Sequence, residues 1–244
     1  MKIIRFFLVV LIFMTNGVVN AALANKNDYD ADYYENEGPM LFKVRPYYSE
    51  VRAKHENLPP PINPGQNTPS ALINHGYGVD TSTSFFFTDY IAAESSLGIV
   101  SYKVKSATLL DIFNNYGTGT ATISSSNDVY VIPVAGALQF HPLPFGGISP
   151  YVGLGYQGSY PLSRAKEFKL RASHGLMVQA GVDLIGRDDK MFTLDIRQYY
   201  SRSKISYRRQ FLNPGNDSSG TLEDIKTKIK WDPIIFSVGF GFRF

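Results

Sequence analysis

The hydrophobic residues of this chain recur at every second position rather than at helical spacing. From residue 41 onward, alternating stretches of roughly ten residues are separated by segments rich in turn-forming residues. A period of two indicates strands, because successive side chains of a strand point to opposite faces. The alternating stretches cover residues 41–54, 78–87, 92–104, 129–141, 151–160, 173–185, 192–208 and 225–244. The sequence therefore predicts an all-β protein of eight strands.

The two faces of these strands differ in a way that favours a membrane protein over a soluble sandwich. In the last strand, Phe236, Val238 and Phe240 alternate with Ser237 and Gly239. In the later strands the polar face is rich in Gly, Gln, Asp and Arg, and poor in the Lys and Glu that cover a solvent-exposed face. Small and polar groups suit a narrow lumen, and closure leaves no strand edge unpaired in lipid. We therefore expect an eight-stranded antiparallel transmembrane β-barrel.

The connections between the strands alternate in length. Residues 88–90, 142–150 and 186–189 are short links, whereas the long links cover residues 55–77, 105–128, 161–172 and 209–224. Outer-membrane barrels have short periplasmic turns and long extracellular loops. The pattern predicts a protein of the bacterial outer membrane with both termini in the periplasm. Aromatic girdles are expected from residues near the strand ends: Tyr47, Tyr48, Tyr90, Tyr151, Tyr160, Tyr199, Tyr200, Trp231 and Phe244.

The N-terminal segment has the layout of a secretory signal peptide. Lys2 and Arg5 precede a short apolar run, and small residues follow up to Ala24. We expect a signal peptide over residues 1–24, with cleavage after Ala21 as the alternative. Residues 25–40 are interpreted as an acidic N-terminal leader, and residues 41–244 as the barrel.

Composition excludes several classes of function. The chain has 24 basic and 21 acidic residues, and loss of Lys2 and Arg5 with the signal peptide leaves 22 against 21, so no nucleic-acid partner is indicated. There is no Cys, and the four His residues have no spacing typical of metal ligands. No metal and no cofactor are expected.

Ionisable residues of both signs fall on the inward face of the predicted strands. Together they predict a paired polar network, because unpaired charge in a narrow lumen is costly. The network would plug the lower lumen, with Glu94, Asp183 and Arg243 nearest the periplasm, although a purely structural role is the alternative. Its predicted members are Lys43, Arg45, Asp80, Glu94, Asp183, Asp195, Arg197 and Arg243.

Apolar residues near the outer mouth are candidate contacts for a ligand. They are Phe86, Val131, Pro133 and Met177, and ordinary packing is the alternative for each. An enzyme is not expected. A hydrolase needs Ser beside His, but His174 falls on the outward face and His141 near the periplasmic end. A structural barrel, or a surface receptor or adhesin acting through its loops, is the alternative function.

Several motifs in the second half of the chain resemble the OmpW family of outer membrane proteins. They are Val131-Ile132-Pro133 to Phe140-His141-Pro142, Pro150-Tyr151-Val152-Gly153-Leu154-Gly155-Tyr156, Gly181-Val182-Asp183, and Asp232-Pro233 to Gly241-Phe242-Arg243-Phe244. The resemblance covers roughly residues 40–244 and follows the same order and spacing as in the family. It implies an eight-stranded barrel with a largely hydrophobic lumen and the passage of small hydrophobic molecules. The inward positions of Asp195 and Arg197 depart from the family pattern.

The C-terminal strand adds two expectations. Phe240, Phe242 and Phe244 resemble the signal by which the barrel-assembly machinery recognises its clients. The expected partners are therefore this machinery, outer-membrane lipid, lipopolysaccharide and a small hydrophobic ligand. Ile229 and Trp231 are odd-numbered, whereas the apolar set after Ile235 is even-numbered. We interpret this change at Asp232-Pro233 as a β-bulge, where a ligand could leave sideways into the bilayer.

Overall fold

The computed structural model describes residues 39–51, 54–56, 73–104, 128–142, 148–162, 168–185, 190–207 and 225–244. The expected signal peptide, nearly all of the acidic leader, and the loops 105–127 and 208–224 lie outside the described residues. Within the described part, no helix is long and apolar enough to cross a membrane.

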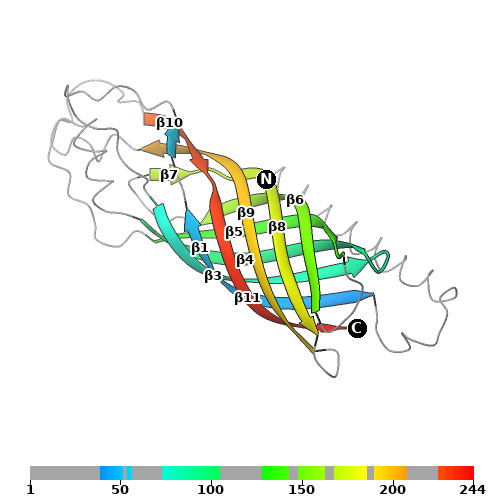
Figure 1. The fold of residues 1–244 in the computed structure, drawn as a ribbon. Helices are drawn as coiled ribbons and strands as arrows, with labels where there is room; N and C mark the ends of the chain where they lie inside the picture. Colours follow the sequence, from blue (N-terminus) through cyan, green and yellow to red (C-terminus); the bar gives the residue numbers. More distant parts are fainter. Residues whose placement is uncertain are drawn as a thin grey trace, which may run out of the picture.

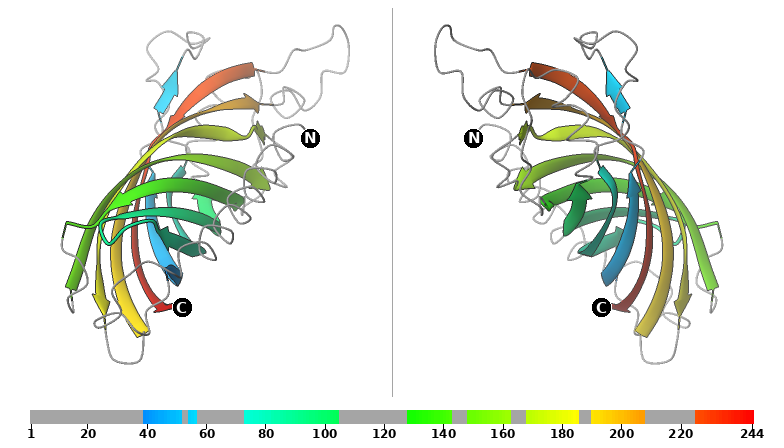
Figure 2. Two further views of the ribbon diagram at one scale, coloured as in Figure 1. Left: turned by 90° about the vertical axis from the view of Figure 1, so that its right-hand side faces the viewer. Right: turned by 90° about the vertical axis from the view of Figure 1, so that its left-hand side faces the viewer.

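The described chain is a closed antiparallel barrel (Figures 1 and 2). Its strands are β1 (Met40–Val51), β2 (Lys54–Glu56), β3 (Ile73–Phe86), β4 (Ile91–Val104), β5 (Val129–Phe140), β6 (Ile148–Leu162), β7 (Phe168–Leu170), β8 (Ser173–Ile185), β9 (Lys190–Tyr207), β10 (Ile225–Trp231) and β11 (Pro233–Arg243). β2 continues β1, β7 leads into β8, and β10 leads into β11, so the wall has eight strands. β11 pairs with both β1 and β9, which closes the barrel. The all-β, eight-stranded prediction is confirmed.

The two ends of the barrel differ in their connections. Residues 87–90, 141–147 and 186–189 join strands at one end, which also holds the first and last strand residues. There Met40 and Phe244 exchange backbone hydrogen bonds of 3.1 and 2.9 Å. We call this the turn end and the opposite end, where β2, β7 and β10 lie, the loop end (Figure 1). Strand β7 falls inside the predicted loop 161–172, so that prediction was wrong at Phe168–Leu170.

The predicted bulge at Asp232-Pro233 is also wrong. Trp231 pairs with Ser201 and Ile234 with Gln198, so the register against β9 is the same on both sides of this step. Odd-numbered residues point inward throughout β10 and β11. What changes is the chemistry of each face. Above Asp232 the outer side carries Lys and the lumen side holds Ile229 and Trp231, whereas along β11 the outer side is apolar and the lumen side becomes small and polar from Ser237 onward. A true register shift occurs in the neighbouring strand, where Leu170 pairs with Ile205 but His174 with Arg202.

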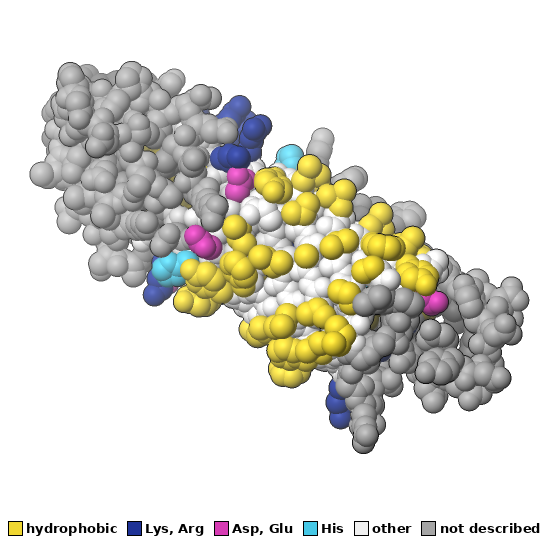
Figure 3. All heavy atoms as spheres, viewed as in Figure 1, with side chains coloured by type: hydrophobic (Ala, Val, Ile, Leu, Met, Phe, Trp, Pro, Cys, Tyr) yellow, Lys and Arg dark blue, Asp and Glu magenta, His cyan; other side chains and the backbone are white. Residues whose placement is uncertain are grey.

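The outer face of the wall is apolar, as the alternation predicts. Among its exposed residues are Leu138, Leu154, Leu176, Phe240 and Phe242, which form part of a broad apolar band (Figure 3). Of the expected girdle residues, Tyr48, Tyr90, Tyr160, Tyr200 and Phe244 are exposed on this face. The remaining four are buried in the lumen, so their assignment to a girdle was wrong: Tyr47, Tyr151, Tyr199 and Trp231. Their odd numbers already placed them on the inward face.

Candidate functional site

The middle of the lumen holds a network of seven charged side chains, all at most 5% exposed: Lys43, Arg45, Asp80, Glu94, Asp183, Asp195 and Arg197. They come from β1, β3, β4, β8 and β9, and each points inward because it has the inward parity of its strand. Seven of the eight residues predicted for the lumen network are therefore buried here. Three are cations and four are carboxylates, so the opposite charges nearly cancel.

Arg45 is the centre of this network. Its Nε atom donates to Asp80 Oδ1 at 2.8 Å, and its two terminal nitrogens donate to the two carboxylate oxygens of Glu94 at 3.2 and 3.3 Å. Glu94 Oε2 also accepts a hydrogen bond from Gln139 Nε2 at 3.1 Å. A bidentate guanidinium and a neutral amide together satisfy a carboxylate that is shielded from water.

Two further bridges cross the lumen. Lys43 Nζ lies 2.9 and 2.8 Å from the two oxygens of Asp183 on β8. Arg197 Nη2 on β9 donates to Asp80 Oδ2 at 2.6 Å, and Arg197 Nε lies 2.6 Å from Asp195 Oδ1. The Tyr151 hydroxyl donates to the other oxygen of Asp195 at 3.0 Å. These contacts join β1 with β8 and β9 with β3 through side chains inside the lumen.

The eighth predicted member, Arg243, lies at the turn end. It is half-buried, and its guanidinium carbon is 5.1 Å from the ring centroid of Phe86. Phe86 itself clusters with Leu41, Ala92 and Met191. Its placement near the outer mouth was therefore wrong, because β3 runs from the loop end to the turn end and Phe86 is its last residue. Phe86 forms part of an apolar base beneath the network.

His141 also belongs to this base, one residue beyond the end of β5. Its ring lies between Phe86 and Tyr151, at centroid distances of 5.0 and 5.3 Å. Its Nδ1 is 3.1 Å from Ser149 Oγ, and Nε2 is buried with no hydrogen-bond partner among the described residues. Burial lowers the pKa of His141 to about 4, so the ring is neutral near neutral pH.

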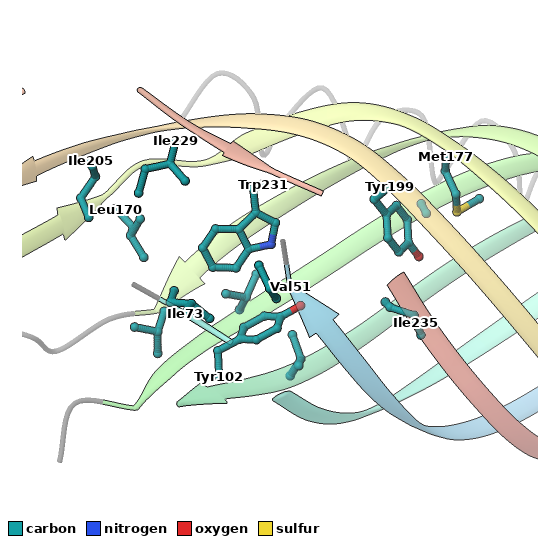
Figure 4. Close-up of a cluster of buried hydrophobic side chains, with 14 of the residues drawn as sticks. Val51, Ile73, Tyr102, Leu170, Met177, Tyr199, Ile205, Ile229, Trp231 and Ile235 are labelled. Carbon is teal, nitrogen blue, oxygen red and sulfur yellow. The ribbon is translucent and has the colours of Figure 1, made fainter. Parts of the chain in front are cut away.

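Above the network the lumen is lined mainly by apolar and aromatic residues, with a minority of polar ones: Gln157, Ser159, Arg171, Ser173 and Ser203. A buried cluster brings together Tyr102, Val131, Ile229, Trp231 and Ile235 with residues of β7 and β9 (Figure 4). The rings of Tyr102 and Trp231 meet edge to face with centroids 5.2 Å apart. Sequence reasoning did not select these two residues for the lumen, although inward parity and large size would have identified them. We call this region the upper chamber.

The free space in the upper chamber is about 30 Å³. Val131 and Pro133, two of the predicted ligand contacts, line it together with Tyr102 and Trp231. Met177 is buried in the same apolar cluster but does not line this space. The space is small, and the aromatic rings of Tyr47, Tyr102, Tyr199 and Trp231 border it.

The ladder of paired residues has a two-residue gap at two places in the described wall: between β4 and β5, beside Pro133, and between β1 and β11, beside Pro46. The pairing of β1 with β11 stops after Val44–Phe240 and resumes at Tyr47–Ser237. Pro46 lies in this gap and has no backbone N–H to donate. Outside the gap is a groove of about 840 Å³, lined by lipid-facing residues such as Tyr48 and Phe236 and also by the lumen-facing Tyr47 and Ser237. We call this place the Pro46 seam.

The residues considered for catalysis do not come together. His174 is exposed on the outer face, where its Nδ1 is hydrogen-bonded to the hydroxyl of Tyr156, while the neighbouring Ser173 is buried in the lumen. Among the described residues, no group of three His, Asp or Glu side chains could hold a metal ion.

Comparisons with known proteins agree with this architecture. The sequence pattern of the OmpW family matches residues 36–244. A Rickettsia bellii protein named as an outer membrane protein is 40% identical over 223 residues, which cover 91% of this chain and 87% of that protein. A similarly named Rickettsia conorii protein is 38% identical over 219 residues, or 89% and 86% of the two chains.

Two solved structures share the fold. The outer membrane protein OprG from Pseudomonas aeruginosa superimposes with a TM-score of 0.62 over 86% of this chain and 97% of its own, at 18% identity. The outer membrane protein AlkL, solved in lipid bilayers, has a TM-score of 0.53 over 90% and 96%, also at 18% identity. At this level of identity the likeness establishes the barrel fold alone.

Proposed function

This chain belongs to the OmpW family of outer membrane proteins, and we propose that it is a narrow conduit for small hydrophobic molecules. In this proposal the molecule enters the upper chamber from the loop end. It does not continue down the lumen, because the charged network plugs it. Instead it leaves sideways through the wall into the bilayer.

The proposal rests on the change in lumen chemistry along the barrel axis. A mainly apolar upper chamber bordered by Val131, Pro133 and Trp231 lies above seven paired charges. Apolar walls favour an apolar ligand. Moving such a ligand between buried ion pairs would separate charges that have no water to solvate them. A hydrophobic molecule in the chamber therefore has a high barrier below it.

Pockets for small ligands typically measure roughly 300–1,000 Å³, so a ligand needs more room than the chamber offers at rest. The free space of about 30 Å³ is bordered by the rings of Tyr102 and Trp231. Rotation of these side chains is the simplest way to admit a ligand, since both are held mainly by contacts with other side chains. The chamber thus acts as a filled site that opens when an apolar guest replaces the aromatic contacts.

The Pro46 seam is the proposed lateral exit, in place of the register break expected at Asp232-Pro233. The missing β1–β11 pairs weaken the wall at Pro46, and the outer groove there is predominantly apolar. Tyr47 lines both the upper chamber and this groove. Movement of one tyrosine ring would therefore connect the two spaces.

The proposal includes the orientation and the assembly route. We assign the turn end, with both termini, to the periplasm and the loop end to the exterior. Phe240, Phe242 and Phe244 face outward and are 70%, 50% and 54% exposed, which leaves them available to the barrel-assembly machinery. The role is a conduit rather than catalysis, supported by the separation of His174 from Ser173.

Proteoliposomes test this function. Vesicles with and without the protein are mixed with a small apolar fluorescent dye, and the rate at which the dye reaches the bilayer is followed by stopped-flow fluorescence. We expect faster transfer with the protein, and slower transfer when Val131→Trp narrows the chamber. Equal rates with and without protein would instead favour a purely structural barrel or a receptor that acts through its loops.

A further inference from the structure

Basic side chains gather on the outer face of the wall at the loop end, over β7, β9 and β10. All of them are exposed, and we call them the basic patch: Lys169, Arg171, Arg202, Lys204, Lys226, Lys228 and Lys230. Figure 3 shows dark blue side chains gathered beside the apolar band near this end. No outward-facing residue of these three strands is acidic. The patch is therefore a concentrated positive surface on one flank of the barrel.

The strand register brings like charges directly opposite each other. Lys204 on β9 is the partner of Lys228 on β10, and Arg202 is the partner of Lys230. The backbone N–H of Arg171 donates to the Lys204 carbonyl at 3.0 Å, so Arg171 flanks the same position from the other side. Like charges facing each other across a strand pair destabilise a sheet. An anion bound between them would remove this cost.

Among the described residues, acidic residues border the patch at two points. Lys230 forms an ion pair with Asp232 at 3.1 Å. On the β2 side, Glu56 is the register partner of Lys228. Glu56 therefore ends, on the β2 side, the row that Arg171, Lys204 and Lys228 form, and the described register partners of β9 residues in the patch include no acidic residue. That row is the best position for an external anion.

The patch lies directly above the lipid-facing band. Tyr200, the outward residue just before Arg202 on β9, is 52% exposed, and Leu176 on β8 is 56% exposed. Outward residues on one strand are about 7 Å apart, so the first cations are one such step above the apolar surface. With the orientation proposed above, this is the level of the lipid headgroups in the outer leaflet.

We propose that the basic patch binds the phosphate group of an outer-leaflet lipid, with Lys204 and Lys228 on either side of the phosphate and Arg171 as a third donor. Phosphate offers several acceptor oxygens and a negative charge, which suits two ammonium groups and a guanidinium. The lipid's acyl chains would then lie along the apolar band below. This site would fix the loop end of the β7–β10 flank in the headgroup layer, independently of any transport.

Native mass spectrometry of the purified full chain tests the proposal. The protein in a zwitterionic detergent is titrated with bisphosphorylated lipid A, and the bound fraction gives an apparent Kd. The test variant is K204Q/K228Q. The matched control is K103Q/K190Q, which removes two exposed lysines from other parts of the outer face. Because all four residues are exposed, we expect both variants to fold, which heat-modified gel mobility verifies.

We expect the apparent Kd for lipid A to rise by about tenfold or more in K204Q/K228Q. In K103Q/K190Q it should change by less than about twofold. Fully dephosphorylated lipid A should bind wild type and both variants equally. Equal weakening in the test and control variants would overturn the proposal. So would displacement of lipid A by an equal concentration of inorganic phosphate, because the site would then select free anions rather than a lipid.

Discussion

Arg197 on β9 and Asp80 on β3 are joined by a hydrogen bond of 2.6 Å across the lumen, although 117 positions separate them in the chain. The same carboxylate accepts a hydrogen bond from Arg45 through its other oxygen. Asp80 on β3 therefore links two guanidinium groups, one from the adjacent strand β1 and one from β9 across the lumen. Arg45, Asp80, Glu94, Asp195 and Arg197 form one connected group, and Lys43 and Asp183 pair with each other, so removal of one member leaves its partner without a counter-charge.

The first prediction concerns Arg45. Arg45→Met keeps much of the side-chain volume but leaves two buried cations, Lys43 and Arg197, facing four buried carboxylates. We expect the free energy of unfolding to fall by about 3–5 kcal/mol. Urea unfolding in lipid vesicles, followed through the fluorescence of the single tryptophan, Trp231, measures this. Lys103→Met, at an exposed position, should change stability by less than about 0.5 kcal/mol.

The second prediction concerns close backbone packing at Gly175 on β8. A Cβ atom there would lie 1.8 Å from the carbonyl oxygen of Tyr200, whereas at Gly136 the nearest atom would be 3.9 Å away. Gly175→Ala should therefore destabilise the barrel by roughly 1–3 kcal/mol or more, and Gly136→Ala should be nearly neutral. The midpoint of urea unfolding compares them, and equal midpoints would contradict the close approach of β8 and β9.

The third prediction is a pH dependence from His141. Its pKa is about 4 in the folded chain against an ordinary value of 6.5, so the unfolded chain binds the proton more readily. Its contribution to stability is fully present above pH 6.5 and is lost as the pH falls towards 4, by up to about 3 kcal/mol. His141→Gln should lose less stability between pH 7 and pH 5 than wild type, and equal losses would contradict a buried neutral ring.

Much of this arrangement follows from alternation alone. Parity assigns Lys43, Arg45 and Asp183 to the lumen correctly, because each lies in a long strand whose two faces differ strongly. Parity does not reveal which charges meet. The pairing of Lys43 with Asp183 depends on the curvature of the wall and on side-chain reach across the lumen, which no local pattern encodes.

The errors have physical causes as well. Phe86 was assigned to the outer mouth on chemistry alone, although the direction of its strand places it at the turn end. The change in apolar parity near Asp232 indicated a bulge because the outer face was assumed to be apolar throughout. The strand extends beyond the lipid-facing band, so its outer face becomes basic and its inner face apolar without any shift in register.

The fourth prediction concerns the Pro46 seam. Tyr48 and Phe236 are register partners beside the gap, and antiparallel partners lie about 4.5–5.5 Å apart, within disulfide reach. The chain has no Cys, so the two introduced thiols of Tyr48→Cys/Phe236→Cys can form a disulfide only with each other. This disulfide should close the seam and slow dye transfer, and its reduction should restore the transfer rate. Leu154→Cys/Val178→Cys staples the continuous β6–β8 pairing and should have no effect. Equal transfer in both oxidised proteins would exclude this exit.

In the proposed function the charged network closes the lumen to water and ions. Single-channel recording in planar bilayers tests it most directly, with wild type compared with Arg45→Ala/Glu94→Ala, which removes a cation and an anion from the centre of the network. Asp89→Ala/Lys103→Ala, at two exposed positions, is the matched control. We predict no steady conductance for wild type and the control, and discrete steps for Arg45→Ala/Glu94→Ala. A large, steady conductance in the wild-type protein would contradict the account.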